Sequence, residues 1–224
     1  MVLEVIQKEV PARGIGYLIL RDCPEERLGE ALGKGMEKLK KAGAKQVLAT
    51  SLPEGEPLRP GPVGVWRLTH VHDMVTMSCP LGPDRPRTED RLTLRPVKKP
   101  QEEKTYLELV NRAFRDVPNA RTFGAADLKV QNHRCGLALR GDQTVGVYEL
   151  DLTEKTPHLA TLAIDPDLWR QGLGRALLLT VLDGLPKVPS CDLVVSTANP
   201  SAVKLYESVG FVQTGVLSSW FEVV

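Results

Sequence analysis

Residues 165–179 read DPDLWRQGLGRALLL. Two glycines, Gly172 and Gly174, stand directly before an apolar run that is typical of a buried helix. Glycine inside a helix costs about 1 kcal/mol relative to alanine, so the pair predicts a loop that leads into the helix. Such a loop lets backbone N–H groups approach a ligand, and the helix N-terminus behind it favours phosphate. For these residues alone, a simple turn closed by the two glycines is an equal alternative.

The composition of the chain is typical of a soluble globular protein. Its 224 residues are 42% hydrophobic and 25% charged, with a formal net charge of +1. This charge gives no indication of nucleic-acid binding. No apolar stretch approaches the length of a bilayer span, and the N-terminal MVLEVIQKEV is not a secretory signal. We therefore expect a cytoplasmic protein with neither a nucleic acid nor a membrane as partner.

Metal ligands and disulfides are not expected. His70 and His72 alternate along THVHDM with Asp73 beside them, which is one possible metal site, but a hairpin face with two surface histidines is far more common. The cysteines stand alone, without the paired spacing of a zinc site or a disulfide framework: Cys23, Cys79, Cys135 and Cys191. The prediction is therefore no metal and reduced thiols.

A proline-rich, charged stretch divides the chain. Residues 79–91, CPLGPDRPRTEDR, have no apolar period and read as a linker. The expected domains are residues 1–79 and 91–224, joined by a linker at 80–90.

Hydrophobic periodicity after the linker predicts a mixed α/β sheet. An amphipathic helix over residues 101–116 carries Tyr106, Leu109, Val110, Ala113 and Phe114 on one face. The other expected elements are strands at 92–97, 158–166 and 191–197, helices at 125–135, at 200–210 and from the opening loop to 185, a hairpin over 136–152 turning near Gly141 and Asp142, and two last strands within 211–224.

Two segments in this order resemble the GCN5-related N-acetyltransferase (GNAT) family. RQGLGRALL at 170–178 is similar to the family's acetyl-CoA pyrophosphate loop, Q/R-x-x-G-x-G/A. NPSAVKLYESVGF at 199–211 matches a later family pattern at Asn199, Ala202, Leu205, Tyr206, Gly210 and Phe211. The resemblance covers residues 91–224 and implies a mixed, mostly antiparallel, twisted sheet flanked by helices.

The resemblance also implies acetyl-CoA as a cosubstrate and a set of residues that bind it. The backbone of the strand at Leu162, Ala163 and Ile164 would pair with the pantetheine arm, and Asn199, with Ala202 beside it, would hydrogen-bond that arm. The pyrophosphate would be held by the loop residues Arg170, Gln171, Gly172, Leu173, Gly174, Arg175 and Ala176. One departure is Trp169, which stands where the family usually has Arg or Gln. Since the family holds the pyrophosphate mainly through main-chain N–H groups, we expect the loop still to bind and the Trp169 side chain to pack.

Catalytic roles follow from the same resemblance. Tyr206 would be the general acid that protonates the departing thiolate, the alternative being a core aromatic. Some family members carry a glutamate as base on the strand before the asparagine, where this chain has Val194. Glu149 and His158 on neighbouring strands are the remaining candidates for the base, and the backbone N–H groups near Leu162 to Ile164 are candidates for polarising the carbonyl.

The N-terminal part contains a faint internal repeat at an offset of 145 or 146 residues. RLGEAL at 27–32 aligns with GLGRAL at 172–177, and QVLATS at 46–51 aligns with DLVVST at 192–197. VGVWRL at 63–68 aligns with VGFVQT at 209–214. In this copy Glu25 and Glu26 stand where a phosphate would arrive, and the prolines of residues 53–62 exclude a helix. Residues 1–79 are therefore expected to form a degenerate GNAT-like half-domain that does not bind the cofactor.

The function expected from the sequence is acetyl-CoA-dependent transfer of an acetyl group to a primary amine, on a small molecule or a peptide. Deprotonating a lysine-like amine at pH 7 costs about 4.6 kcal/mol and an α-amine only about 1 kcal/mol, which slightly favours the α-amine where no carboxylate is placed as base. A CoA-binding sensor without turnover is the main alternative. A nucleotide-binding domain is weaker, since the loop lacks the Lys-Ser/Thr ending of a P-loop. The sequence leaves open the identity of the acceptor, the acyl group and the oligomeric state.

Overall fold

A computed structural model describes residues 2–52, 57–82, 88–117 and 119–224. The chain forms two compact units, which are interleaved along the sequence. The first unit comprises residues 1–75, 196–198 and 216–224, and the second comprises 76–195 and 199–215. The long strands β5 (Trp66–Pro80) and β11 (Val212–Val223) each contribute residues to both units.

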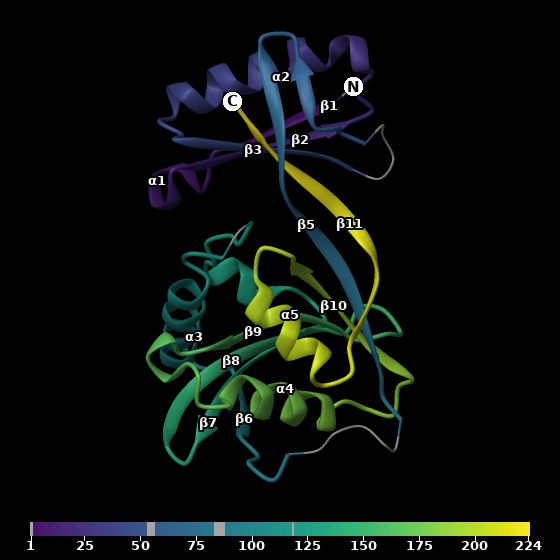
Figure 1. The fold of residues 1–224 in the computed structure, drawn as a ribbon. Helices are drawn as coiled ribbons and strands as arrows, with labels where there is room; N and C mark the ends of the chain where they lie inside the picture. Colours follow the sequence, from purple (N-terminus) through teal and green to yellow (C-terminus); the bar gives the residue numbers. More distant parts are fainter. Residues whose placement is uncertain (1, 53–56, 83–87, 118) are drawn as a thin grey trace. The chain divides into compact units, whose positions relative to one another are not determined.

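The second unit is built on a mixed sheet (Figure 1). Its strands lie in the order β11-β5-β10-β9-β8-β7-β6. Neighbours from β6 to β9 pair antiparallel, whereas β9 and β10 pair parallel, which confirms the mixed and mostly antiparallel sheet expected from the sequence. The strands not yet bounded are β6 (Thr93–Pro96), β7 (His133–Arg140), β8 (Gln143–Asp151), β9 (His158–Ile164) and β10 (Ser190–Ser196).

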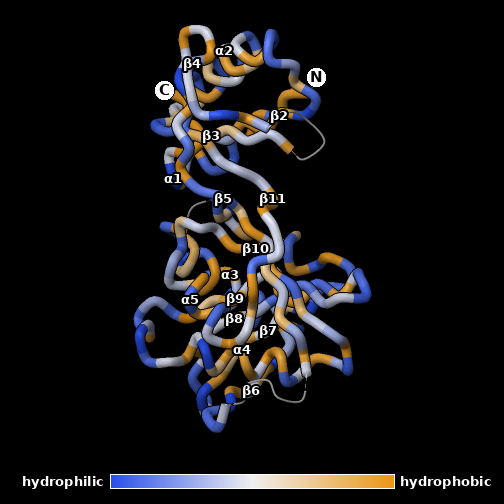
Figure 2. The backbone as a smooth tube through the Cα atoms, turned by 45° about the vertical axis from the view of Figure 1, so that its right-hand side comes forward, coloured by the Kyte–Doolittle hydropathy of each residue, from blue (hydrophilic) through white to orange (hydrophobic). Residues whose placement is uncertain are grey.

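Helices cover both faces of this sheet because neighbouring strand residues point to opposite sides. Helix α3 (Pro100–Ala113) packs through Tyr106 against Val147 and Ala163, as its periodicity predicted. Helix α4 (Leu173–Asp183) lies on the other face, where a Cβ on Gly146 would meet the Leu177 side chain at 3.2 Å. Helix α5 (Pro200–Glu207) follows β10. Figure 2 shows hydrophobic stretches in β8 and β9, between these helices.

The first unit has its own core and a smaller sheet. Its strands lie in the order β1-β2-β3-β11-β5, with β4 paired to β5. Leu18, Leu32 and Leu39 are fully buried between this sheet and helix α2. Its elements are β1 (Val2–Ile6), α1 (Val10–Arg13), β2 (Ile15–Arg21), α2 (Glu25–Lys41), β3 (Gln46–Ser51) and β4 (Gly61–Val63).

The two units share the order strand, helix, parallel strand at the offset seen in the sequence. In the first unit this is β2-α2-β3, and in the second it is β9-α4-β10. After β3, residues 57–60 form no helix, in agreement with the prolines there, while residues 53–56 lie outside the described residues. Strands β2 and β3 pair through six positions, from Ile15–Gln46 to Leu20–Ser51. The facing edges of β2 and β3 are therefore paired along nearly the whole of both strands.

Two expected elements differ in the structure. The helix expected at 125–135 is only a 3-10 helix, Ala125–Lys129, because it has no buried face and Asn132 turns the chain into β7 with a left-handed φ of 65°. The two strands expected within 211–224 are one strand, β11. Its neighbour β5 comes from far earlier in the chain, so no local hairpin is formed.

The expected domain boundary lies partly outside the described residues. Residues 83–87 of the expected linker at 80–90 lie outside the described residues, and the division into domains at 79 and 91 stays a prediction.

The two neighbouring histidines of β5 have different surroundings. His70 Nε2 lies 2.9 Å from Asp73 Oδ1, and the buried His72 ring stacks on Trp220. Among the described residues, no group of three or more side chains is arranged to hold a metal ion, and no helix is long and apolar enough to span a bilayer.

Candidate functional site

The parallel strands β9 and β10 separate after a short contact. They pair only at His158–Asp192 and Leu159–Leu193, although β9 continues to Ile164 on its other side against β8. A β-bulge at Ala160 marks the point of separation, because Leu159 pairs with Leu150 and Thr161 with Glu149. The β10-facing edge of β9 is therefore open beyond Leu159.

Backbone groups of alternate residues point to this open edge. The Asp165 amide donates to the Val145 carbonyl on the β8 side at 2.9 Å. Because successive residues of a strand alternate in direction, the N–H and C=O groups of Ile164 and Leu162 face the other way, toward the open edge. This edge offers the two N–H groups and the Leu162 carbonyl to an extended ligand, while the Ile164 carbonyl accepts from the Trp169 indole.

The loop that follows β9 brings backbone amides to the N-terminus of α4. Gly172 has a left-handed φ of 78°, and a Cβ there would meet nothing within 4 Å. The amides of Arg175 and Ala176 both donate to the Gly172 carbonyl, so intrahelical bonding begins with them. The earlier amides, from Gly172 to Gly174, are those that a helix N-terminus leaves for a ligand.

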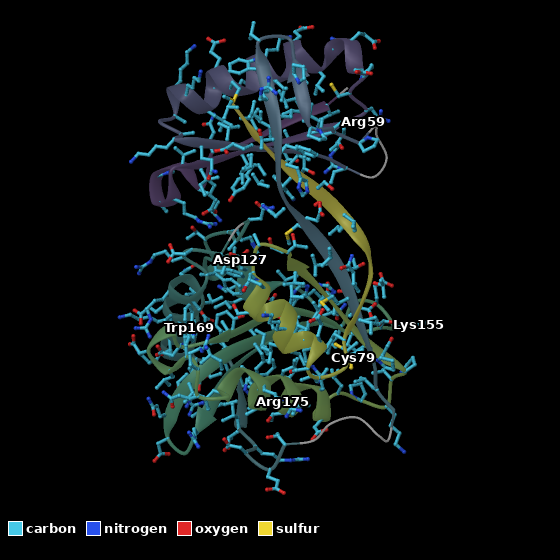
Figure 3. The ribbon with its side chains drawn as sticks, viewed as in Figure 1. Arg59, Cys79, Asp127, Lys155, Trp169 and Arg175 are labelled. Atoms are coloured by element: carbon cyan, nitrogen blue, oxygen red, sulfur yellow. The ribbon has the colours of Figure 1, made fainter. Side chains whose placement is uncertain are left out.

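Two interactions fix this loop. Arg112 on α3 forms an ion pair with Asp165, whose carboxylate also accepts from the Asp167 amide at 3.0 Å. The indole Nε1 of Trp169 donates to the Ile164 carbonyl at 2.9 Å. The expectation that Trp169 packs is wrong for much of its ring, because the side chain is 54% exposed and uses its polar tip at the strand edge. Figure 3 labels Trp169 and Arg175, which precede and follow the glycines.

A cavity of about 490 Å³ joins the loop to the open edge. Most of the residues predicted to bind the cofactor line this cavity, whereas Gln171, Arg175 and Ala176 do not. Its walls come from the end of α3, from β9, from the loop and from α5. The lining residues are Ala113, Phe114, Val117, Leu162, Ala163, Ile164, Leu168, Trp169, Arg170, Gly172, Leu173, Gly174, Asn199, Ser201, Ala202 and Leu205.

Helix α5 presents one side to this cavity. Asn199 caps the helix, its Oδ1 accepting from the Ala202 amide at 3.2 Å, so the N–H bonds of its side chain are the groups it can offer a ligand. A Cβ on Gly174 would lie 3.3 Å from the Leu205 side chain, which shows how closely α4 and α5 approach. A side chain at 174 would require Leu205 to shift by a few tenths of an ångström, whereas at 172 it is the left-handed backbone conformation that favours glycine.

Tyr206 does not line this cavity. It lies one helical turn after Ala202, on the same side of α5, and its ring packs against Phe211 with centroids 5.7 Å apart. Burial of the hydroxyl raises the pKa of Tyr206 to about 12. The phenol is therefore protonated throughout the neutral range.

The two candidate bases have different environments. Glu149 is only 4% exposed and both oxygens are engaged, Oε1 at 2.6 Å from His133 Nδ1 and Oε2 accepting from the Thr161 hydroxyl at 2.9 Å. His158 is partly buried at the start of β9, in the short segment that pairs with β10. Burial lowers the pKa of His158, while the Asp151 and Asp192 carboxylates act in the opposite direction. His158 is therefore neutral at pH 7 and able to accept a proton.

Several residues around the site were not predicted from the sequence. Phe114 and Val117 line the cavity from the C-cap of α3 and the turn that follows it, and His133 and Asp192 belong to the surroundings of the candidate bases. Helical periodicity places Phe114 on the inner face of α3. Strand register, which brings His133 and Asp192 to their neighbours, cannot be read from a single sequence.

Known proteins resemble this chain in the same region. A family model of the acetyltransferase (GNAT) domain matches residues 100–219, more than half of the chain. The chain belongs to the GNAT family. The match to the GNAT model includes the open edge of β9, the glycine loop and α5.

Relatives and one solved structure agree with this membership. A ribosomal protein bS18-alanine N-acetyltransferase of Escherichia coli is 43% identical over 65 residues, which are 28% of this chain and 44% of that protein. A mycothiol acetyltransferase of Nocardiopsis dassonvillei is 32% identical over 146 residues, which are 57% of this chain and 44% of that protein. The chain spans less than half of the length of these two relatives. A GCN5-related N-acetyltransferase from Sphaerobacter thermophilus shares the GNAT fold with a TM-score of 0.61 at 14% identity, over 99% of this chain and 75% of that one.

Proposed function

We propose that this protein is an N-acetyltransferase that uses acetyl-CoA as cosubstrate and transfers the acetyl group to a primary amine. The observation that carries this proposal is the separation of β9 and β10 after two paired positions, together with a cavity that is lined by the open part of β9 and by the glycine loop. The amides at Gly172 to Gly174 suit a diphosphate, and the edge at Leu162 and Ile164 suits the amides of a pantetheine arm. The open space at Gly172 fits the same ligand.

Among its described residues, the first unit has neither an open edge between its parallel strands nor a glycine loop before α2, although a cavity of about 780 Å³ lies at the start of that helix. Its parallel strands β2 and β3 stay paired through six positions, so no strand edge opens between them. Glu25 and Glu26 begin α2 at the position of the phosphate loop, where their charges repel an anion. We assign cosubstrate binding to the second unit alone.

Catalysis requires a proton to leave the amine and another to reach the sulfur of the leaving thiol. Acetyl-CoA supplies the activated thioester. His158 is the better of the two candidate bases, because Glu149 already uses both oxygens. Tyr206 is the proposed acid, held protonated by burial. The Ala160 bulge, beside His158, adds an unpaired backbone segment where the carbonyl would be polarised.

The acceptor class rests on the energetics of deprotonation. Because an α-amine is cheaper to deprotonate than a lysine side chain by about 3.5 kcal/mol, a site with a histidine base favours the α-amine. One relative is named for an alanine of a ribosomal protein and another for mycothiol, so protein and small-molecule acceptors both belong in the test.

A thiol-release assay with acetyl-CoA and a panel of amines tests the proposal. The panel includes a peptide with a free α-amine, the same peptide with a blocked N-terminus and a free lysine, and small primary amines. Faster release with the free α-amine is expected, and the N-blocked peptide is its matched control. Tight acetyl-CoA binding without thiol release from any amine would favour the alternative, a CoA-binding sensor.

A further inference from the structure

Four ionisable residues lie in register on four adjacent strands of the second unit. His133 on β7 is in register with Asp151 on β8, Asp151 with His158 on β9, and His158 with Asp192 on β10. Partners in register point their side chains to the same face of a sheet. These residues, called here the ionisable row, therefore alternate histidine and aspartate along one line.

Both aspartates of the row are held by groups other than His158. Asp151 Oδ1 accepts from the Thr153 amide at 2.8 Å, and its Oδ2 lies 3.4 Å from His133 Nε2. Asp192 Oδ1 accepts from the Ser78 hydroxyl at 2.5 Å. Ser78 lies on β5, 114 residues earlier in the chain, so the N-terminal part of the sequence supplies one anchor of the row.

The row crosses the sheet where β9 and β10 separate. His158 belongs to the first of the two pairs that join these strands, and the open edge begins two residues later at Ala160. A ligand that runs along this edge from the loop at Gly172 has its far end at the point where β9 and β10 separate, called here the fork. The end of the proposed pantetheine arm that carries the thioester would therefore lie beside His158.

We propose that Asp151 and Asp192 are positioning residues that orient His158 from both sides and stabilise its charged form during acetyl transfer. The inference rests on the proposed function. In the reaction the amine nitrogen forms a bond to the acetyl carbon, and the carbon–sulfur bond breaks with its electron pair on sulfur. The nitrogen, which attacks as the neutral amine, loses one proton to His158, and the sulfur takes one proton from Tyr206. Proton exchange with solvent then returns both side chains to their starting states. The products are the amide and the thiol.

The charges around His158 give the direction of the effect. Three carboxylates favour the imidazolium form of His158: Asp151, Asp192 and Glu149. His133 opposes that form. Burial is the larger influence and keeps His158 neutral at rest. Removing one carboxylate leaves burial less opposed, so the pKa of His158 falls further and the side chain becomes a weaker base.

Asp192→Asn is the test variant, because asparagine keeps the shape and a carbonyl oxygen for Ser78 while it removes the charge. Asp142→Asn, in the exposed turn between β7 and β8, is the matched control. Two readouts are measured on the full chain: the titration of His158 by NMR of labelled histidine, assigned with His158→Gln, and the pH profile of kcat and KM with acetyl-CoA and the best amine.

We expect Asp192→Asn to move the His158 titration and the acid limb of kcat/KM to lower pH. We also expect kcat to fall several-fold with KM for acetyl-CoA unchanged, and Asp142→Asn to match the parent. If Asp192→Asn does not fold, Asp151→Asn is measured, with the same expected direction. An unchanged titration and profile in a folded variant of an active parent would overturn the positioning role. No thiol release by the parent with any amine would instead contradict the proposed function, and the positioning role with it.

Discussion

The indole Nε1 of Trp169 donates a hydrogen bond to the backbone carbonyl of Ile164, at 2.9 Å. This bond ties the residue that directly precedes the glycine loop to the end of the open strand β9, and both residues line the cavity. The family usually places Arg or Gln at this position. In this chain a partly exposed tryptophan performs the local task of holding the loop against the strand.

Loss of this bond is expected to weaken cosubstrate binding more than turnover. Trp169→Phe keeps an aromatic ring but removes the donor, so we predict a KM for acetyl-CoA several-fold higher with kcat nearly unchanged. Trp169→Gln restores a donor and is expected to recover part of the affinity. Equal KM values for the Phe variant and the parent would contradict a role for the hydrogen bond.

Substitution at Gly172 tests the phosphate loop. Gly172→Glu forces a side chain into a left-handed conformation and adds a negative charge beside the amides, so we expect acetyl-CoA binding to be lost in calorimetry. Gly141→Glu is the matched control, because Gly141 also has a positive φ of 59° and open space around its Cβ position. Micromolar binding retained by Gly172→Glu, with the control also unaffected, would show that the diphosphate is held elsewhere.

The protonation of Tyr206 predicts the alkaline side of the pH profile. Its pKa is raised to about 12, so the phenol carries its proton below that pH and loses it only as the pH rises through that value. We therefore expect kcat to show no fall from Tyr206 up to about pH 10, the ordinary pKa of a tyrosine.

Tyr206→Phe complements this profile. We expect kcat to fall about 100-fold with acetyl-CoA affinity almost unchanged, because only the proton donor is removed. The ring packing against Phe211 is kept by phenylalanine, so thermal unfolding of the variant is the control for stability. Full activity in this variant would remove Tyr206 from the acid role.

The burial of β5 in the second unit predicts a stability effect far from the loop. Met77 on β5 is only 1% exposed and belongs to the second unit. Met77→Ala is expected to lower the free energy of unfolding by about 2–5 kcal/mol, measured by urea denaturation, because it leaves a cavity in the core. Thr69→Ala, at an exposed position of the same strand, should change it little. A Met77→Ala variant as stable as the parent would contradict the burial of β5 there.

Local sequence patterns were sufficient to predict much of the second unit. The apolar run after Gly174 predicted α4, the hairpin at Gly141 was placed correctly, and the face of α3 that carries Tyr106 and Val110 is the buried one. Each of these features depends on periodicity or on a glycine at a turn. Such signals lie within a few residues of one another in the sequence.

Features that depend on distant residues were not predicted. The pairing of β5 with β10 and β11 joins segments more than 100 residues apart, and the two strands expected within 211–224 are a single strand, β11. The ionisable row depends on strand register, and a shift of one residue would turn His158 to the other face. The Trp169 bond depends on side-chain geometry at a position where the family pattern has a different residue.

A crystal structure of the protein with bound CoA tests the central claim most directly. The account predicts a diphosphate within hydrogen-bond distance of the amides from Gly172 to Gly174, and a pantetheine arm along β9 at Leu162 and Ile164, with its sulfur at the fork beside His158. A CoA molecule bound in the first unit near Glu25, or a CoA whose arm leaves the edge of β9 unpaired, would contradict it.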